Sequence, residues 1–283
     1  MLRSGIFLTL LLARGADAAP AELRRDLVYA EAGGETLRLD AAVPAGPGPF
    51  PIAILIHGGG WTSGTKSGDI APWLEPLAAA GFTAFSIDYR LAPRHRWPAC
   101  RDDVLAAIRW AKTHAADYKA DAARVALIGY SAGGHLACFA ATDPAPGVRV
   151  QAVVGLAALT DFEQELPQRG HVLGRAQQGL LARGPELTPE SLALLRELSP
   201  VNHLRAGLPP FLLVHGDADR SVPHLQSVVF RDKLLALGVR CDLITLAGAP
   251  HRMSEWAKFQ GGYVAQTVAW LRTALAPVRH TIP

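Results

Sequence analysis

Short, mostly apolar runs recur along the chain, and between them lie longer stretches whose apolar residues are three or four positions apart. A continuous apolar run is typical of a strand buried on both faces, whereas three-to-four spacing is typical of an amphipathic helix. The runs predict strands at residues 24–31, 35–43, 51–57, 82–89, 125–130, 150–158, 210–215 and 241–246. The spaced stretches predict helices at residues 71–80, 98–114, 132–141, 225–237 and 261–275.

This alternation of strands and helices predicts an α/β fold, with a mostly parallel sheet covered by helices on both faces. Gly33-Gly34 separates the first two strands as a hairpin turn, and Gly81 and Gly238 stand where helices would end. The sequence contains no internal repeat, no low-complexity segment and no break in composition. Residues 19–283 are therefore predicted to form a single domain.

Residues 160–207 interrupt the alternation, because they contain no predicted strand and only two plausible short helices. One interpretation is a small cap-like insertion that acts as a lid over a site, since long irregular insertions are often functional. The other is a connection that packs on the sheet and has no role in substrate choice. The sequence favours neither.

The composition is that of a globular protein with a sizeable core: 49% of the 283 residues are hydrophobic and 19% are charged. The net charge is only +3 and the basic residues are scattered, so nucleic acid is not an expected partner. Cys100, Cys138 and Cys241 have no metal-ligand spacing and are predicted to be buried free thiols. In an exported protein one pair could be oxidised, but the sequence does not choose it.

The first eighteen residues have the pattern of a signal peptide. A positive start at Met1-Leu2-Arg3 is followed by an apolar run over residues 6–13 and a small-x-small cleavage site at Ala16-Asp17-Ala18. We therefore expect a secreted or periplasmic protein, with a cytoplasmic location as the alternative if this segment is not cleaved. The run is too short to span a bilayer and no other segment is long and apolar enough, so integral membrane association is not expected.

The most informative motif is Gly129-Tyr130-Ser131-Ala132-Gly133, which lies between an apolar strand and a small-residue helix. A turn this sharp crowds the backbone on both sides of Ser131, so residues without a Cβ are needed at Gly129 and Gly133. Such a turn presents the serine hydroxyl as a nucleophile. The alternative is a serine that merely caps the following helix.

A serine nucleophile needs a base and an acid, which this kind of sheet supplies in the order Ser, acid, His. Asp217 and Asp219 both follow the strand at residues 210–215, and we expect Asp219 to be the acid and Asp217 to bond the turn backbone. His251 follows the last strand and is the expected base. His215 and His224 are weaker candidates, because the former ends a buried strand and the latter starts a helix.

Three glycines in His57-Gly58-Gly59-Gly60-Trp61 follow the strand at residues 51–57 and allow backbone N–H groups to approach a ligand. With the residue after the nucleophile, they predict an oxyanion hole made by Gly59, Gly60 and Ala132. The alternatives are a flexible loop or a phosphate cradle, but the Lys-Ser/Thr ending and the helix of a phosphate loop do not directly follow Gly60. Trp61, Trp97 and Tyr130 are candidates for the wall of a substrate pocket and equally plausible as packing residues.

In these motifs the chain resembles the α/β-hydrolase superfamily. It is most similar to the HGGG-bearing esterases related to hormone-sensitive lipase and to bacterial feruloyl and acetyl esterases. The resemblance implies Ser131 as nucleophile, Asp219 as acid and His251 as base. It also implies structural roles for Asp88, Arg90 and Asp103. The resemblance also includes the motif Asp88-Tyr89-Arg90-Leu91-Ala92-Pro93. Arg94 departs from the family here, since relatives often carry Glu after this proline, and the insertion is shorter than a full lipase lid.

The expected activity is hydrolysis of small or short-acyl carboxylic esters through an acyl-enzyme, without a metal or an organic cofactor. Acetyl and feruloyl esters of plant polysaccharide are candidate substrates, and the oligomeric state is open. One alternative is arylformamidase-like hydrolysis of an activated amide such as N-formylkynurenine. Another is a catalytically inactive hydrolase fold that serves only for binding.

Overall fold

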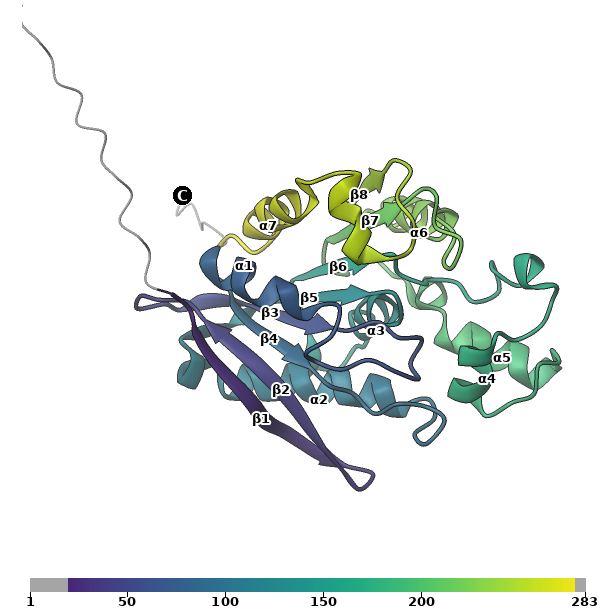
Figure 1. The fold of residues 1–283 in the computed structure, drawn as a ribbon, viewed down its shortest axis with the longest axis horizontal. Coiled ribbons are helices and arrows are strands. Elements are labelled where there is room, and N and C mark those ends of the chain that lie inside the picture. Colours follow the sequence, from purple (N-terminus) through teal and green to yellow (C-terminus); the bar gives the residue numbers. More distant parts are fainter. Residues whose placement is uncertain (1–19, 278–283) are drawn as a thin grey trace, which may run out of the picture.

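An eight-stranded sheet forms the centre of the computed structural model, which describes residues 20–277 (Figure 1). The signal peptide predicted for residues 1–18 lies outside the described residues. The strands are β1 (Glu22–Ala32), β2 (Glu35–Val43), β3 (Phe50–Ile56), β4 (Thr83–Ile87), β5 (Ala120–Tyr130), β6 (Ala152–Leu156), β7 (Phe211–Gly216) and β8 (Cys241–Leu246). The α-helices are α1 (Leu74–Ala79), α2 (Ala99–Thr113), α3 (Ala132–Ala140), α4 (Arg175–Leu181), α5 (Pro189–Leu198), α6 (Leu225–Ala236) and α7 (Tyr263–Ala274).

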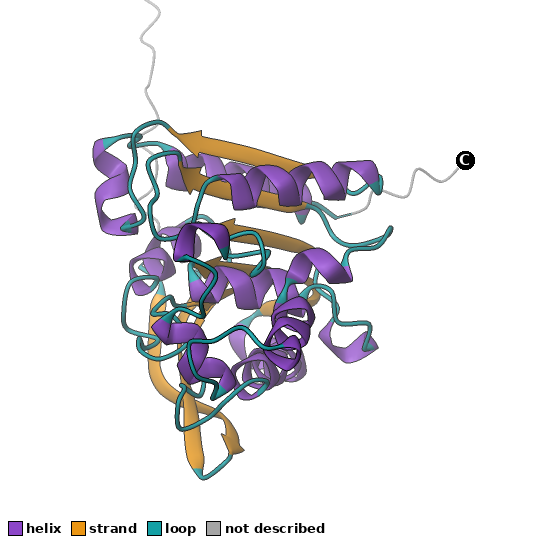
Figure 2. Cartoon of the chain, turned by 90° about the vertical axis from the view of Figure 1, so that its right-hand side faces the viewer, coloured by secondary structure: helices purple, strands orange, loops and turns teal. Residues whose placement is uncertain are grey.

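The strand order is β1-β2-β4-β3-β5-β6-β7-β8, and the neighbours from β4 to β8 all run parallel. The strands β1 and β2 pair antiparallel, and so do β2 and β4. The predicted hairpin of β1 and β2 is confirmed, and it projects beyond the helices at the bottom of Figure 2. The predicted mostly parallel α/β sheet is therefore correct.

Alternate residues of the central strands point into two separate cores. In β3, Ile52, Ile54 and Ile56 pack into the core that contains α2, α3 and α6, whereas Ala53 and Leu55 pack into the core beneath α1 and α7. All five side chains are fully buried, which explains the continuous apolar run of this strand. Figure 1 shows α1 and α7 on one side of the sheet and α2 and α3 on the other. The predicted helices on both faces are confirmed.

Some predicted boundaries are wrong. The strand β5 begins at Ala120 rather than at residue 125, because Ala120 and Asp121 pair with the start of β3 before a shift in register. The strand β6 covers only Ala152–Leu156, because the backbone turns to a positive φ of 45° at Ala157. The first helix begins as a 3₁₀ turn over Ala71–Trp73, and its α-helical part is Leu74–Ala79.

The segment at residues 160–207 contains two short α-helices, α4 and α5, and no strand, as its sequence predicts. Thr188 caps α5 by accepting a hydrogen bond from the backbone N–H of Ser191 at 3.2 Å. The inner side of the segment is apolar, since Leu180, Leu195 and Leu198 are buried. Part of the segment therefore packs as an extension of the core.

Ion pairs and hydrogen bonds brace the loop that follows β3. Nζ of Lys66 lies 2.7 Å from Asp40 and 3.0 Å from Asp26, and the backbone N–H of Lys66 donates to Asp88 at 2.7 Å. Nearby, Arg90 binds Asp103 through two nitrogens, Nη2 at 2.7 Å and Nε at 2.9 Å. These contacts agree with structural roles for Asp88, Arg90 and Asp103.

Cys100, Cys138 and Cys241 are free and buried, as predicted. Burial raises the pKa of the Cys100 and Cys241 thiols to about 12. Both thiols are therefore protonated near neutral pH and act as small apolar side chains. Between residues 20 and 277, no helix has the length and apolar character needed to cross a membrane.

Candidate active site

Ser131 occupies a sharp turn between the end of β5 and the start of α3. Its backbone has φ 53° and ψ −116°, values that few residues other than glycine adopt. A Cβ at Gly129 would lie 2.0 Å from the carbonyl oxygen of Gly133, and one at Gly133 would lie 2.1 Å from that of Ile56. Both positions therefore require glycine, as predicted. Ser131 stands at the N-cap position, but its side chain makes no capping hydrogen bond.

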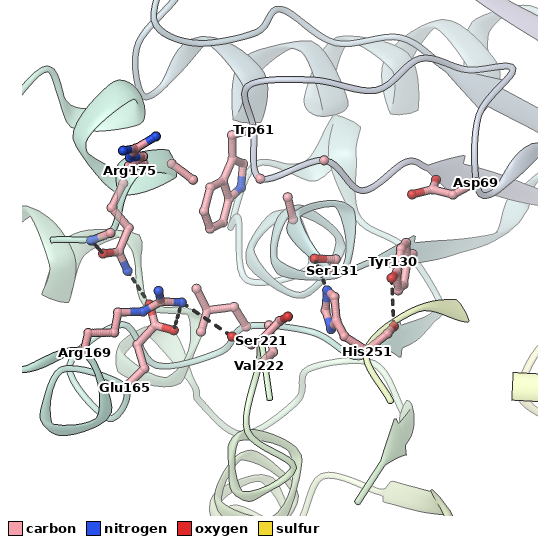
Figure 3. A pocket seen from close by; sticks show the side chains of 17 residues that line it. Trp61, Asp69, Tyr130, Ser131, Glu165, Arg169, Arg175, Ser221, Val222 and His251 are labelled. Carbon is pink, nitrogen blue, oxygen red and sulfur yellow. Dashed lines mark hydrogen bonds and ion pairs between the residues drawn. The ribbon is translucent and has the colours of Figure 1, made fainter. Parts of the chain in front are cut away.

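The hydroxyl of Ser131 faces a histidine instead of the helix. Its Oγ lies 2.9 Å from Nε2 of His251 (Figure 3). On the other side of the imidazole, Nδ1 of His251 lies 2.6 Å from Oδ2 of Asp219. The structure thus brings together three side chains from three separate strand ends, in the geometry of a nucleophile, a base and an acid. An ionised carboxylate can only accept, so Nδ1 of His251 carries the proton and Nε2 is free to accept the proton of Ser131.

The carboxylate of Asp219 is held by four donors. Its Oδ1 accepts from the backbone N–H groups of Ser221 (2.8 Å) and Val222 (2.9 Å), while Oδ2 faces both His251 and His215. Burial alone would raise the pKa of Asp219, but hydrogen bonds with His215 and His251 outweigh burial and hold it well below its ordinary value. Asp219 therefore stays ionised and fixes the tautomer of His251.

The other candidates take different roles. Oδ1 of Asp217 accepts from the backbone N–H of Gly248 at 2.6 Å, so this exposed carboxylate bonds the turn, as predicted. Nε2 of His224 faces the hydroxyl of Thr245 at 3.0 Å. His215 is fully buried and contacts Asp219 rather than Ser131. The sequence did not identify this contact.

The glycine loop after β3 lies beside Ser131. Within residues 20–277, the backbone N–H groups of Gly59, Gly60 and Ala132 donate to no protein acceptor, although all three residues line the same cavity as Ser131. Gly59 has a φ of 108°, and a Cβ there would lie 2.1 Å from the carbonyl oxygen of Ser63. The turn that exposes these N–H groups therefore needs glycine at this position. The three groups have the chemistry of an oxyanion hole.

A cavity of about 440 Å³ opens beside Ser131 and His251. Tyr130 and Trp61 line it, as expected for pocket residues. Trp97 does not line it: its ring packs against Phe139, and its Nε1 donates to Glu197 at 3.2 Å. The assignment of Trp97 as a pocket residue is therefore wrong, because the chain after Pro93 leads this side chain away from Ser131 and towards α3 and α5.

Tyr130 also holds the loop that carries His251. Its hydroxyl donates to the carbonyl oxygen of His251 at 2.8 Å, and its ring stacks on the imidazole with centroids 5.4 Å apart. Burial raises the pKa of Tyr130 to about 12, so the hydroxyl remains a donor near neutral pH. Tyr130 thus both lines the cavity and positions the histidine.

Several residues of the cavity wall were not predicted. Asp69 comes from the loop after β3, and Glu165, Arg169, Arg175 and Gln177 come from the segment at residues 160–207. This segment has no periodic pattern that could assign its side chains to a site. No group of three or more His, Cys, Asp or Glu side chains in the described part of the chain is arranged to hold a metal ion.

A scan of protein families matches residues 39–234 to the BD-FAE family model. The esterase LipC of Mycobacterium tuberculosis is 32% identical over 234 residues, which cover 78% of this chain and 57% of that protein. The chain spans about half the length of the curated relatives it matches.

Among solved structures, esterase Est2 of Thermogutta terrifontis has a TM-score of 0.71 and 28% identity, with 92% of this chain and 95% of that chain covered. Est2 structures with bound butyrate or propionate are similar to this chain as well. A truncated carbohydrate esterase from gut microbiota has a TM-score of 0.78 at 24% identity, covering 92% of this chain and 98% of that chain. The latter likeness concerns the fold alone.

Proposed function

Because the chain belongs to the BD-FAE family and has the α/β-hydrolase fold, we propose that it hydrolyses carboxylic esters with Ser131 as the nucleophile. The observation that carries the proposal is the hydrogen-bonded series from Ser131 through His251 to Asp219. It lies beside a cavity with three backbone N–H groups that find no acceptor among residues 20–277. Each element needed for acyl transfer by serine has a candidate here.

In the first step, Oγ of Ser131 attacks the ester carbonyl carbon while Nε2 of His251 takes its proton. The 2.9 Å contact between these atoms is short enough for direct transfer. Asp219 holds Nδ1–H of His251 and stabilises the imidazolium that forms. The carboxylate itself keeps its charge throughout.

The carbonyl oxygen becomes an oxyanion in this step. The N–H groups of Gly59, Gly60 and Ala132 are fixed before the substrate arrives, so they stabilise the charge without reorganisation. Loss of one such donor typically costs about 3 kcal/mol of transition-state stabilisation.

Collapse of the first tetrahedral intermediate breaks the C–O bond, and His251 gives its proton to the leaving alcohol. Water then attacks the acyl-enzyme with His251 again as the base, which releases the acid and restores Ser131. No group outside these side chains and water is required to balance the reaction.

The proposal extends to small or short-acyl esters. A cavity of about 440 Å³ lies at the small end of the range for ligand pockets, and the similar Est2 binds propionate and butyrate. Acetyl and feruloyl esters of plant polysaccharide are the natural substrates that we include in this class.

Hydrolysis of p-nitrophenyl acetate, propionate, butyrate and octanoate by the purified protein tests the activity, with acetylated xylan and methyl ferulate as further substrates. We expect rates to be highest at two to four acyl carbons. Ser131→Ala should lower kcat by about 10⁶-fold and abolish covalent labelling by a fluorophosphonate. A wild-type protein that neither hydrolyses these esters nor reacts with the fluorophosphonate would rule out the proposed function.

Export to the periplasm or the medium is the second part of the proposal. It depends on the charge and hydropathy pattern of residues 1–18, which lie outside the described residues. Mass spectrometry of the protein from its native cells should find Ala19 at the N-terminus. An uncleaved Met1 would argue against export and favour the amide-hydrolysing alternative.

A further inference from the structure

The cavity beside Ser131 has two unlike sides. Asp69 and Tyr130 lie on one side of the serine, whereas Arg169 and Arg175 lie on the other (Figure 3). Both arginines belong to the segment at residues 160–207, and neither takes part in the mechanism described above.

Arg169 is held in place but keeps free donors. Its Nη2 lies 2.9 Å from Oε2 of Glu165, whose side chain is only 2% exposed, whereas the side chain of Arg169 is 38% exposed. Gln177 donates to the other oxygen of Glu165 and fixes that carboxylate. Across residues 20–277, Nε and Nη1 of Arg169 have no acceptor. Nη1 lies next to Gly174, which lines the cavity.

Arg175 is exposed and lines the cavity, and its guanidinium has no acceptor and no ion-pair partner in the described part of the chain. Arg220 is the third arginine on this side of the site and, like Arg175, has no acceptor and no ion-pair partner between residues 20 and 277. It lies in an adjoining hollow of about 310 Å³ that shares Glu165 and Arg169 with the cavity. This side of the site thus has three guanidinium groups and one buried carboxylate.

An excess of guanidinium donors at a cavity wall attracts anionic groups, because arginine binds a carboxylate through paired charge-assisted hydrogen bonds. The potential is strongest where the wall is concave and partly shielded from water. A neutral acetyl or butyryl ester would leave these donors unused.

We propose that Arg169 and Arg175 form an anion-binding subsite, which selects ester substrates carrying a carboxylate a few bonds from the scissile bond. This inference rests on the proposed function and names the substrate class of the same site. Arg175 supplies the unpaired charge, and Arg169, positioned by Glu165 and Gln177, supplies directed donors. Arg220, which lies in the adjoining hollow, adds positive charge that attracts the same carboxylate.

Matched pairs of charged and neutral esters test the subsite. On the acyl side the pair is mono-p-nitrophenyl adipate and its methyl ester, both followed by release of p-nitrophenol. On the alcohol side the pair is p-acetoxybenzoate and p-acetoxybenzamide. We expect kcat/KM for the charged member of at least one pair to exceed that of its neutral partner about fivefold at low salt. The preference should shrink as added NaCl screens the charges.

Three variants test whether the preference for charged esters comes from the cavity wall that carries Arg169 and Arg175. Arg175→Gln should remove most of the preference, because kcat/KM should fall much further for the charged esters than for the neutral ones. Glu165→Gln keeps the hydrogen-bonding shape but removes the negative charge, so the preference should rise about twofold. Arg183→Gln changes an exposed arginine of the same segment that does not line the cavity, and it should behave as wild type.

The outcomes separate the two proposals. No hydrolysis of any ester would remove the proposed function. Hydrolysis of the neutral esters without preference for either charged ester would overturn only the anion-binding subsite. A preference that persists in Arg175→Gln, or that disappears equally in Arg183→Gln, would also overturn it.

Discussion

Nε2 of His215 lies 3.2 Å from Oδ2 of Asp219, the same oxygen that accepts the hydrogen bond of His251. Nε2 of His215 also lies 2.9 Å from the carbonyl oxygen of Val222. Both neighbours are acceptors, so Nε2 of His215 carries a proton. Its Nδ1 lies 2.8 Å from the hydroxyl of Ser227. A buried histidine thus helps to hold the acid of the candidate triad, at the same carboxylate oxygen that contacts His251.

Replacement of His215 by Phe keeps the ring but removes its donor. Hydrogen bonds to charged groups contribute about 1.5–3 kcal/mol, and Asp219 would orient His251 less well. We expect kcat for p-nitrophenyl acetate to fall by at least about tenfold. The matched control is His224→Phe, which removes a nearby histidine at the N-cap of α6 that faces Thr245. Equal activity of the two variants would contradict a positioning role for His215.

Asp219→Asn and Asp217→Asn separate the two neighbouring acids. The asparagine at position 219 cannot hold His251 in the required tautomer, so kcat should fall by about 10⁴-fold. At position 217 an asparagine oxygen can still accept from the N–H of Gly248, so activity should stay near wild type. Steady-state kinetics with p-nitrophenyl acetate measures both. Greater damage from the change at position 217 would show that the acid is misassigned.

The pKa of Asp219 predicts how the stability depends on pH. Because the folded-state pKa lies below the ordinary value of 3.8, the unfolded chain binds a proton at this group before the folded chain does. The stabilisation is therefore fully present above pH ~5 and is lost as pH falls through ~4 and below. Urea unfolding at several pH values should show a steeper acid loss for wild type than for Asp219→Asn. Parallel curves for the two proteins would be inconsistent with an ionised, stabilised Asp219.

Gly133→Ala tests the packing of the nucleophile turn. The new methyl group would lie 2.1 Å from the carbonyl oxygen of Ile56 and 2.4 Å from that of His57, and neither backbone atom can move freely. We expect a loss of about 3 kcal/mol or more in the free energy of unfolding. Gly147→Ala is the control, since a methyl group at that position would have no neighbouring atom within 4 Å. Similar unfolding midpoints for the two variants would argue against the tight turn.

The sequence predicted the fold because the buried parallel strands produce continuous apolar runs, as in Ile52–Ile56. Ser131 was predicted as the nucleophile because the sharp turn around it leaves no room for a Cβ at Gly129 or Gly133, and few sequences meet this steric condition. Asp219 and His251 were then found by their places after successive strands. The apolar runs, the glycines of the turn and the positions after the strands are all local features of the sequence, and each follows from one physical requirement of the fold or the site.

The residues that the sequence did not predict depend on contacts between distant segments. Glu165, Arg169 and Arg175 line the cavity because of how an irregular segment folds back over Ser131, and no spacing in that segment encodes this path. The contact of His215 with Asp219 depends on a turn of four residues whose side-chain directions have no periodic signal. Trp97 was a candidate for the pocket wall and equally plausible as a packing residue, and its neighbours Phe139 and Glu197 make it the latter.

The contact of Gly133 with the backbone of Ile56 and His57 has an evolutionary consequence. It joins the turn that carries the nucleophile directly to the end of the strand that leads into the glycine loop, through main-chain atoms alone. The reacting atoms and the oxyanion donors therefore keep their relative positions whatever side chains the segment at residues 160–207 presents. Substitutions in that segment can change which esters enter, while the chemistry that cleaves them is inherited unchanged.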